Sequence, residues 1–471
     1  MFGRFHTKQH FHRNMTGLAI PIAIQTLLIS SLNMVDSLMI GQLGVDNIAA
    51  TGVGNKIITI LILVLQGFGS GAAIFSAQYW GKKDLQGIRK ILYLTCIIMS
   101  VFSLAFSLVT LIFTSSFIRI FTDDIAVIEL GVTYLRIISL SYFVTALTVL
   151  FSTILKSMGE VKRPLYISII AICLNTVLNY LLIFGHVGFA QLGIEGAAIA
   201  TLIARTVQTF MLFVLIKQYL QISIKSIHVK EVLDRPLVKR YFMITIPSII
   251  NHALWTAGET TYFWVYAQMG TEQLAAVTLI DPLLFVFMAL FIGLSDASTV
   301  MVGNSIGEND EEKAVKYAKQ YLWITFGFSI ISAVGIFATS PLYISIYNVS
   351  DVVAIEAKNI LIVYTFLITG KMLNMVNNIG VLRAGGDTKY VLYLDIMGVW
   401  AVGLPLALLG AFVWELPIYL VFALANSHEL LRAIFGIKRT LSKKWINHVT
   451  KSENYQVTTE SSTTSSNNVL N

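Results

Sequence analysis

An acidic residue stands within an apolar stretch near the start of the chain. Asp36 lies in "SSLNMVDSLMIGQLG" (residues 30–44), and the surrounding segment from Gly17 to Gly41 contains neither lysine nor arginine. An ionised aspartate inside a membrane helix costs about 2.5–3.5 kcal/mol even on the scales that give the lowest costs. Because acidic residues inside membrane segments have functional roles by default, Asp36 is a candidate binding site for a cation or a transported proton.

Two later apolar segments place oxygen-bearing side chains at a similar expected depth. Asn175 and Asn179 are four residues apart in "NTVLN" and therefore share one helix face, and Thr201 follows in the next segment. One carboxylate, two amide oxygens and a hydroxyl suit a small hard cation such as Na+. The same groups could instead hold a protonated Asp36. The two asparagines could also be hydrogen-bond partners between helices, without any ion.

Four more charged side chains fall well inside apolar segments of the second half of the chain. They could form a second coupling site or be tied up in salt bridges, and Glu259 with Lys371 is one such pairing. A polar contact between two helices is a further role for Asp296. The four residues are Glu259, Asp296, Lys371 and Asp395.

The composition shows what elements must position these groups. Of 471 residues, 56% are hydrophobic and only 13% are charged, with a mean hydropathy of +0.73, which excludes an ordinary soluble protein. Helices are expected because unpaired backbone groups cannot face lipid. The sequence therefore predicts an all-α polytopic membrane protein with twelve spans, each long enough to cross a bilayer. The spans are 17–41, 53–80, 91–115, 127–155, 164–187, 193–216, 241–268, 280–303, 320–345, 359–382, 390–411 and 413–431.

The positive charges are distributed unevenly among the connecting loops. Placing the N-terminus inside puts most of the 33 Lys and Arg residues on that same side of the membrane. This is the positive-inside bias, so we expect cytoplasmic N- and C-termini and a multi-pass protein of the plasma membrane. The net charge of +7 is then explained by topology, and no nucleic-acid partner is expected.

The second half of the chain repeats the first. Pro21 in "IPIAIQTLLIS" matches Pro247 in "IPSIINHALWT", an offset of 247 − 21 = 226, and "QLGVDNIAA" matches "QMGTEQLAA" at the same offset. An even number of spans in each repeat gives two parallel lobes, a common plan in carriers whose substrate site lies between the repeats. The expected domains are a cytoplasmic segment (1–16), an N-lobe (17–216), a linker (217–240), a C-lobe (241–437) and a disordered cytoplasmic tail (438–471).

These segments resemble the multidrug and toxic compound extrusion (MATE) family. The similarity lies in "LAIPIAIQTLLISSLNMVDSLMIGQLGVDNIAATGVG", "LNTVLNYLLIFGHVGFAQLGIEGAAIATLIAR" and "GVLRAGGDTKYVLYLDIMGVWAVGLPLA". The resemblance implies a monomeric H+- or Na+-coupled antiporter, surrounded by membrane lipid, that needs no cofactor and exports organic, cationic or amphipathic compounds by alternating access. It also implies a coupling site at Asp36, Asn175, Asn179, Ala197 and Thr201, with the first three as metal ligands if Na+ is the ion.

The resemblance also bears on the second lobe. Glu259 resembles the acid that some family members carry in the seventh helix, whereas Lys371 departs from the family pattern in the tenth. A coupling site in the N-lobe is therefore the stronger expectation.

Two other functions compete with an exporter. A flippase for lipid-linked intermediates would line its cavity with basic residues, but away from their ends the spans contain only Arg136, Arg205 and Lys371, which favours cationic or neutral cargo. A membrane-embedded enzyme is the other alternative. The chain lacks HExxH and a phosphate-binding glycine loop with a lysine, and no catalytic residues are predicted.

Overall fold

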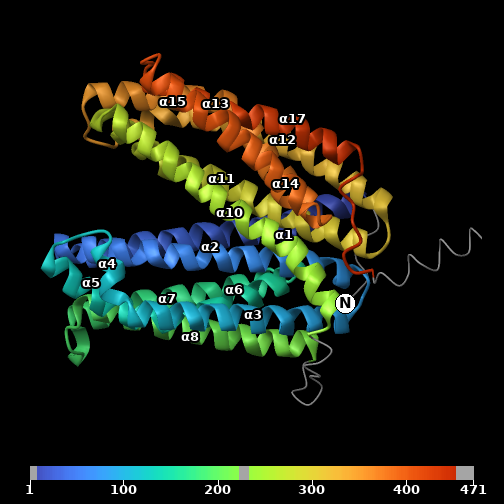
Figure 1. The fold of residues 1–471 in the computed structure, drawn as a ribbon, viewed down its shortest axis with the longest axis horizontal. Helices are drawn as coiled ribbons and strands as arrows, with labels where there is room; N and C mark the ends of the chain where they lie inside the picture. The colour runs from blue at the N-terminus through green and yellow to red at the C-terminus, as the bar shows by residue number, and fades with distance from the viewer. Residues whose placement is uncertain (1–7, 222–232, 452–471) are drawn as a thin grey trace, which may run out of the picture.

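The computed structural model describes residues 8–221 and 233–451, and within these ranges it contains helices and no strand. Figure 1 shows two bundles of long helices that come together at one end and spread apart toward the other. The N-terminal end of α1 (Lys8–Gly41) lies where the bundles meet. We call this the joined end of the molecule, and the opposite end the open end.

The N-terminal bundle contains the six predicted spans of the first repeat. The predicted span 127–155 is two helices, α5 and α6, which meet at an angle of 47°. Ser139 and Ser141 at the junction donate to the carbonyls of Arg136 and Ile138, and such side-chain bonds to the backbone bend helices. The elements are α1, α2 (Val45–Gly81), α3 (Leu85–Ile112), α4 (Thr114–Arg119), α5 (Ile125–Ser139), α6 (Ser141–Ser157), α7 (Lys162–Phe184), η1 (His186–Gly188) and α8 (Gly193–Leu220).

The C-terminal bundle contains the other six spans, two of which change helix type partway. A π-helical stretch follows Asn374 and another follows Asp395, and such stretches are frequent at functional sites. The elements are α10 (Arg235–Met269), α11 (Thr271–Gly307), α12 (Glu311–Ser345), α13 (Asp351–Asn374), η3 (Met375–Leu382), α14 (Thr388–Asp395), η4 (Ile396–Gly403), α15 (Leu404–Phe412), α16 (Ile418–Asn426) and α17 (His428–Leu441).

The predicted all-α architecture with twelve spans is confirmed. Ten helices of the described residues are long and apolar enough to cross a membrane, and the bent pair α5 and α6 makes an eleventh span. The twelfth is α10, which has 35 residues but carries too many polar side chains to count by composition alone. Most helices extend past at least one of the predicted ends.

The duplicated sequence appears in the structure as a symmetric crossing of α2 and α11. A Cβ atom added to Gly81 would overlap the carbonyl oxygen of Asn304, and one added to Gly307 would overlap the carbonyl oxygen of Gln78. These contacts interchange under the offset of 226, since 81 + 226 = 307 and 78 + 226 = 304. The two glycines let the lobes approach backbone to backbone at the joined end.

The segment after α17 lies across both lobes at the joined end. The Trp445 side chain is fully buried, the Asn447 amide donates to the Gly385 carbonyl (2.9 Å), and the Val449 amide donates to Gln78 Oε1 on α2 (3.0 Å). The predicted start of the disordered tail, at residue 438, is therefore too early in the chain, because residues 438–451 belong to the folded part.

The linker between the lobes is also shorter than the sequence predicts, because helices occupy both ends of the predicted range. Helix α8 continues to Leu220 and α10 starts at Arg235, so parts of the range 217–240 are helical. The middle of that linker, 222–232, and the predicted tail from 452 to 471 lie outside the described residues.

Candidate coupling site and cavity

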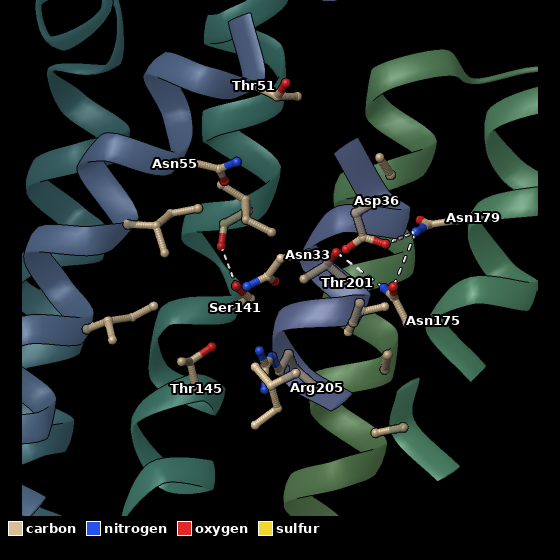
Figure 2. A pocket seen from close by; sticks show the side chains of 18 of the residues that line it. Asn33, Asp36, Thr51, Asn55, Ser141, Thr145, Asn175, Asn179, Thr201 and Arg205 are labelled. Carbon is tan, nitrogen blue, oxygen red and sulfur yellow. Dashed lines mark hydrogen bonds between the residues drawn. The ribbon is translucent and has the colours of Figure 1, made fainter. Parts of the chain in front are cut away.

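The predicted N-lobe residues lie together where α1, α7 and α8 face one another (Figure 2). Asn179 Nδ2 donates to Asp36 Oδ1 (2.7 Å) and to Asn175 Oδ1 (3.2 Å), and Asn175 Nδ2 donates to Thr201 Oγ1 (3.3 Å). The four-residue spacing of the asparagines places both on the face of α7 that looks toward the acid. Ala197 lines the same cavity one turn before Thr201.

The cluster has more hydrogen-bond acceptors than donors. Asn179 is only 1% exposed, and its Oδ1 atom has no hydrogen-bond partner. Leaving a buried acceptor unsatisfied costs about 1–3 kcal/mol. A cation among these oxygens, or a proton added to Asp36 and donated to Asn179, would satisfy it.

The charge of the cluster suits a monovalent ion. Asp36 is its single carboxylate, and the asparagines and Thr201 are neutral. In the described ranges, no group of three or more His, Cys, Asp and Glu residues is placed to hold a metal ion. One carboxylate with neutral oxygens balances one Na+ ion or one proton, whereas divalent sites in proteins use several charged ligands.

The cluster forms part of the wall of a cavity of about 320 Å³ inside the N-terminal bundle. This volume is at the lower end of the range of small-molecule sites, and the lining mixes apolar side chains with a few polar groups, as such sites do. Helices α1, α2, α5, α6, α7 and α8 all contribute. The polar lining includes Asn33, Asp36, Thr51, Asn55, Ser141, Thr145, Asn175, Asn179, Thr201, Arg205 and Gln208.

Asp395 in the C-lobe lies in a different environment. It is 5% exposed, forms an ion pair with Arg432, and accepts a hydrogen bond from Asn251. Arg432 also pairs with Glu429 (3.1 Å), which in turn accepts from Asn374 Nδ2 (2.7 Å). Arg432 pairs with both acids of this network, so the geometry makes Asp395 a salt-bridge partner.

Among the described residues, no direct ion pair joins the remaining predicted C-lobe residues to one another. Asp296 Oδ2 lies 3.9 Å from Lys156 Nζ of the N-lobe, which makes an ion pair between the lobes. Glu259 is exposed, and the described part of the chain shows no ion pair between it and Lys371. The predicted pairing of Glu259 with Lys371 is therefore not a direct salt bridge, although the two charges lie near enough to interact electrostatically.

The sequence interpretation missed three charged residues that matter in the structure. Glu429 and Arg432 lie at or just past the end of the last predicted span, yet both are buried. The signal available in the sequence is their spacing of three residues, which places the two side chains next to each other on one face of a helix. From the sequence, Arg205 is only an argument against a flippase, but in the structure it lines the cavity that also contains Asp36 and the two asparagines.

Comparison with known proteins gives the family. The MatE family model matches residues 21–181 and 247–409, two matches that start 226 residues apart, as the internal repeat does. The uncharacterized transporter YisQ of Bacillus subtilis is 25% identical over 92% of this chain and 95% of its own length. The probable multidrug resistance protein NorM of Thermotoga maritima is 22% identical over 92% of this chain and 93% of its own length.

Solved structures show the same fold. The MATE transporter VcmN of Vibrio cholerae superposes with a TM-score of 0.85 at 18% identity, covering 94% of this chain and 99% of that one. An outward-facing MATE transporter of the MOP superfamily superposes with a TM-score of 0.80 at 19% identity, covering 92% of this chain and 96% of that one. The family match spans most of the chain and includes both repeats. The chain therefore belongs to the MatE family and is a multidrug-efflux transporter of the plasma membrane rather than an enzyme.

Proposed function

We propose that this transporter is an antiporter in which a cation bound at Asp36, either Na+ or H+, drives the export of small organic, amphipathic or cationic compounds. The observation that carries the proposal is the unsatisfied Asn179 Oδ1 beside a carboxylate that makes no ion pair with any described residue; Arg205 interacts with it only at longer range. An acid hydrogen-bonded only to neutral groups can gain and lose a cation, whereas an acid in a salt bridge cannot do so without leaving a buried charge unpaired.

The arrangement of the lobes supports an outward-facing state. Helix ends and loops at the joined end carry Lys82, Lys83, Lys162 and Arg163, so the positive-inside bias favours a cytoplasmic location for that end. The lobes spread apart at the other end, and Asp36 lies on α1 only five residues before that end at Gly41. In this state, a cation from outside would reach the cluster without crossing the contact of α2 with α11 at Gly81 and Gly307.

In this mechanism, cation binding and release of the exported compound are coupled through the same cavity. A cation at Asp36 neutralises the carboxylate, so a bound compound loses its electrostatic attraction to the cavity wall and leaves outward. The empty carrier then opens toward the cytoplasm, where the cation leaves and the next compound enters. By linkage, the compound must weaken cation binding by the same factor by which the cation weakens binding of the compound.

The membrane potential can contribute to transport. One positive charge moving inward through 100 mV supplies about 2.3 kcal/mol. At about 1.4 kcal/mol per tenfold ratio, this could maintain a gradient of roughly 50-fold for a neutral compound exchanged for one ion. Exchange against a monovalent organic cation moves no net charge, so the ion gradient alone would drive it.

The test uses proteoliposomes loaded with a rhodamine dye, in which a Na+ step and a pH step are imposed separately. We expect one of the two steps to accelerate dye movement by wild-type protein and to have no effect on the Asp36→Asn variant. Asp46→Asn is the matched control, because Asp46 is exposed at the start of α2 and does not line the cavity. An unchanged response in Asp36→Asn would refute the proposed role.

A further inference from the structure

Arg205 is a basic residue in the wall of the same cavity that contains the coupling acid. It lies on α8, one turn after Thr201, and Figure 2 shows it in the cavity together with Asp36 and Thr145. An arginine inside a membrane segment is expensive and therefore needs an explanation. The proposed coupling cycle does not use it.

Buried neighbours fix the position of the Arg205 side chain. Arg205 Nη1 donates to Gln208 Oε1 (3.1 Å), and Gln208 Nε2 donates to Ser168 Oγ (3.2 Å). Ser168 Oγ also accepts from Gln25 Nε2 (2.7 Å). Gln25, Ser168 and Gln208 are all at most 6% exposed, so this chain of hydrogen bonds runs from α1 through α7 to α8 inside the protein.

Most of the hydrogen-bonding capacity of the guanidinium is left for a ligand. A guanidinium has five N–H donors in a planar fork, and the bond to Gln208 uses one of them. No acidic side chain of the described residues forms an ion pair with Arg205 in this structure. Asp36 lines the same cavity, but its carboxylate is hydrogen-bonded to Asn179.

The cavity thus presents a positive fork and a negative carboxylate at separate places on its wall. Planar forks of this kind bind carboxylates through two parallel hydrogen bonds. We propose that Arg205 is a specificity-determining residue that selects exported compounds carrying an acidic group, and that the preferred substrates are zwitterions whose basic group faces Asp36. This proposal rests on the proposed function, because the cavity must be the substrate site. It narrows the class of exported compound that the sequence predicts.

The competing explanation is that Arg205 serves as an internal counter-ion for Asp36. In that case, removing Arg205 would change the cation dependence of transport, and the presence of an acidic group on the substrate would not matter. The two explanations therefore predict different measurements on the same variants.

A matched pair of dyes tests the proposal. Rhodamine 110 carries a free carboxylate, and rhodamine 123 is its methyl ester with the same cationic ring system. Binding of each dye to purified protein is measured by fluorescence polarisation at neutral pH. We expect wild-type protein to bind rhodamine 110 at least about tenfold more tightly than rhodamine 123, which corresponds to about 1.4 kcal/mol.

Variants assign the preference to the guanidinium. Arg205→Gln should abolish the preference by weakening rhodamine 110 while rhodamine 123 still binds, which also shows that the cavity is intact. Arg205→Lys should keep part of it, since it retains the charge but not the fork. Arg136→Gln is the matched control, because Arg136 is exposed and does not line the cavity, and it should keep the full ratio.

The failures are distinguishable. Equal binding of the two dyes by wild-type protein, or an unchanged ratio in Arg205→Gln, would overturn the proposal even if a Na+ or pH step still drives transport through Asp36. A preserved ratio in a protein that responds to neither step would instead refute the antiport mechanism and leave the role of Arg205 standing.

Discussion

The two lobes are built from repeats of one sequence, yet their buried acids lie in opposite electrostatic settings. Asp36 in the N-lobe is hydrogen-bonded to a neutral amide beside a cavity of about 320 Å³. Asp395 in the C-lobe is paired with Arg432 and accepts a hydrogen bond from Asn251. The difference teaches that an intramembrane acid must be judged by its partners: we propose that the first acid exchanges a cation, whereas the second is tied into an ion pair within its lobe.

The largest expected effect separates activity from stability. Asp36→Asn should reduce efflux of a rhodamine dye from cells to the level of cells without the transporter, because the neutral side chain cannot attract a cation. The amount of folded protein in the membrane should stay unchanged, since Asp36 is half-buried and its partner is neutral. Dye retention together with immunodetection measures both, and efflux that persists would contradict the comparison.

The C-lobe network should respond in the opposite way. Arg432→Gln leaves Asp395 and Glu429 as buried acids without their cation, which should destabilise the protein by about 3–5 kcal/mol. Thermal unfolding of the purified protein in detergent measures the loss. Adding Asp395→Asn and Glu429→Gln removes the uncompensated charges and should restore most of the stability. A stable single variant, or a triple variant with no recovery, would show that the network is not structural.

Asn179 donates a hydrogen bond to Asp36 and also carries the unsatisfied oxygen, so its removal should weaken cation binding. Asn179→Ala deletes a hydrogen bond to a charged group, worth about 1.5–3 kcal/mol, together with one candidate ligand oxygen. The half-saturating cation concentration for transport should rise about tenfold, the ratio that corresponds to about 1.4 kcal/mol. Asn426→Ala is the control, because that amide bonds the carbonyl of Phe422 outside the cavity. Equal effects of both substitutions would argue against the site.

The smallest expected effect is at Thr201. Thr201→Val keeps the shape of the side chain but removes the hydroxyl that accepts from Asn175. A neutral hydrogen bond contributes about 0.5–1.5 kcal/mol, so the half-saturating cation concentration should rise about threefold. Thr201→Ser should retain the wild-type value. An effect as large as that of Asn179→Ala would indicate that Thr201 contributes more than its hydrogen bond to Asn175.

The fold and the N-lobe cluster could be predicted because each follows from a local pattern. Apolar runs gave the twelve spans, and the four-residue spacing of Asn175 and Asn179 placed both on one face. The C-lobe partners could not be predicted, because Asp395 meets Arg432 only through tertiary packing across 37 residues of chain. The sequence pattern also predicts a polar tail over residues 438–451, whereas Trp445 is fully buried and lies against Gly385 of the C-lobe.

The central claim, that Asp36 is the reversible cation site of this transporter, is tested most directly by measuring cation binding to purified protein. Binding of radioactive Na+ and uptake of protons on a pH step would be recorded for wild type, Asp36→Asn and Asp46→Asn. We predict saturable binding of one of these cations that rhodamine 110 reduces, that disappears in Asp36→Asn, and that is unchanged in Asp46→Asn. Binding of the same affinity in Asp36→Asn would contradict the account.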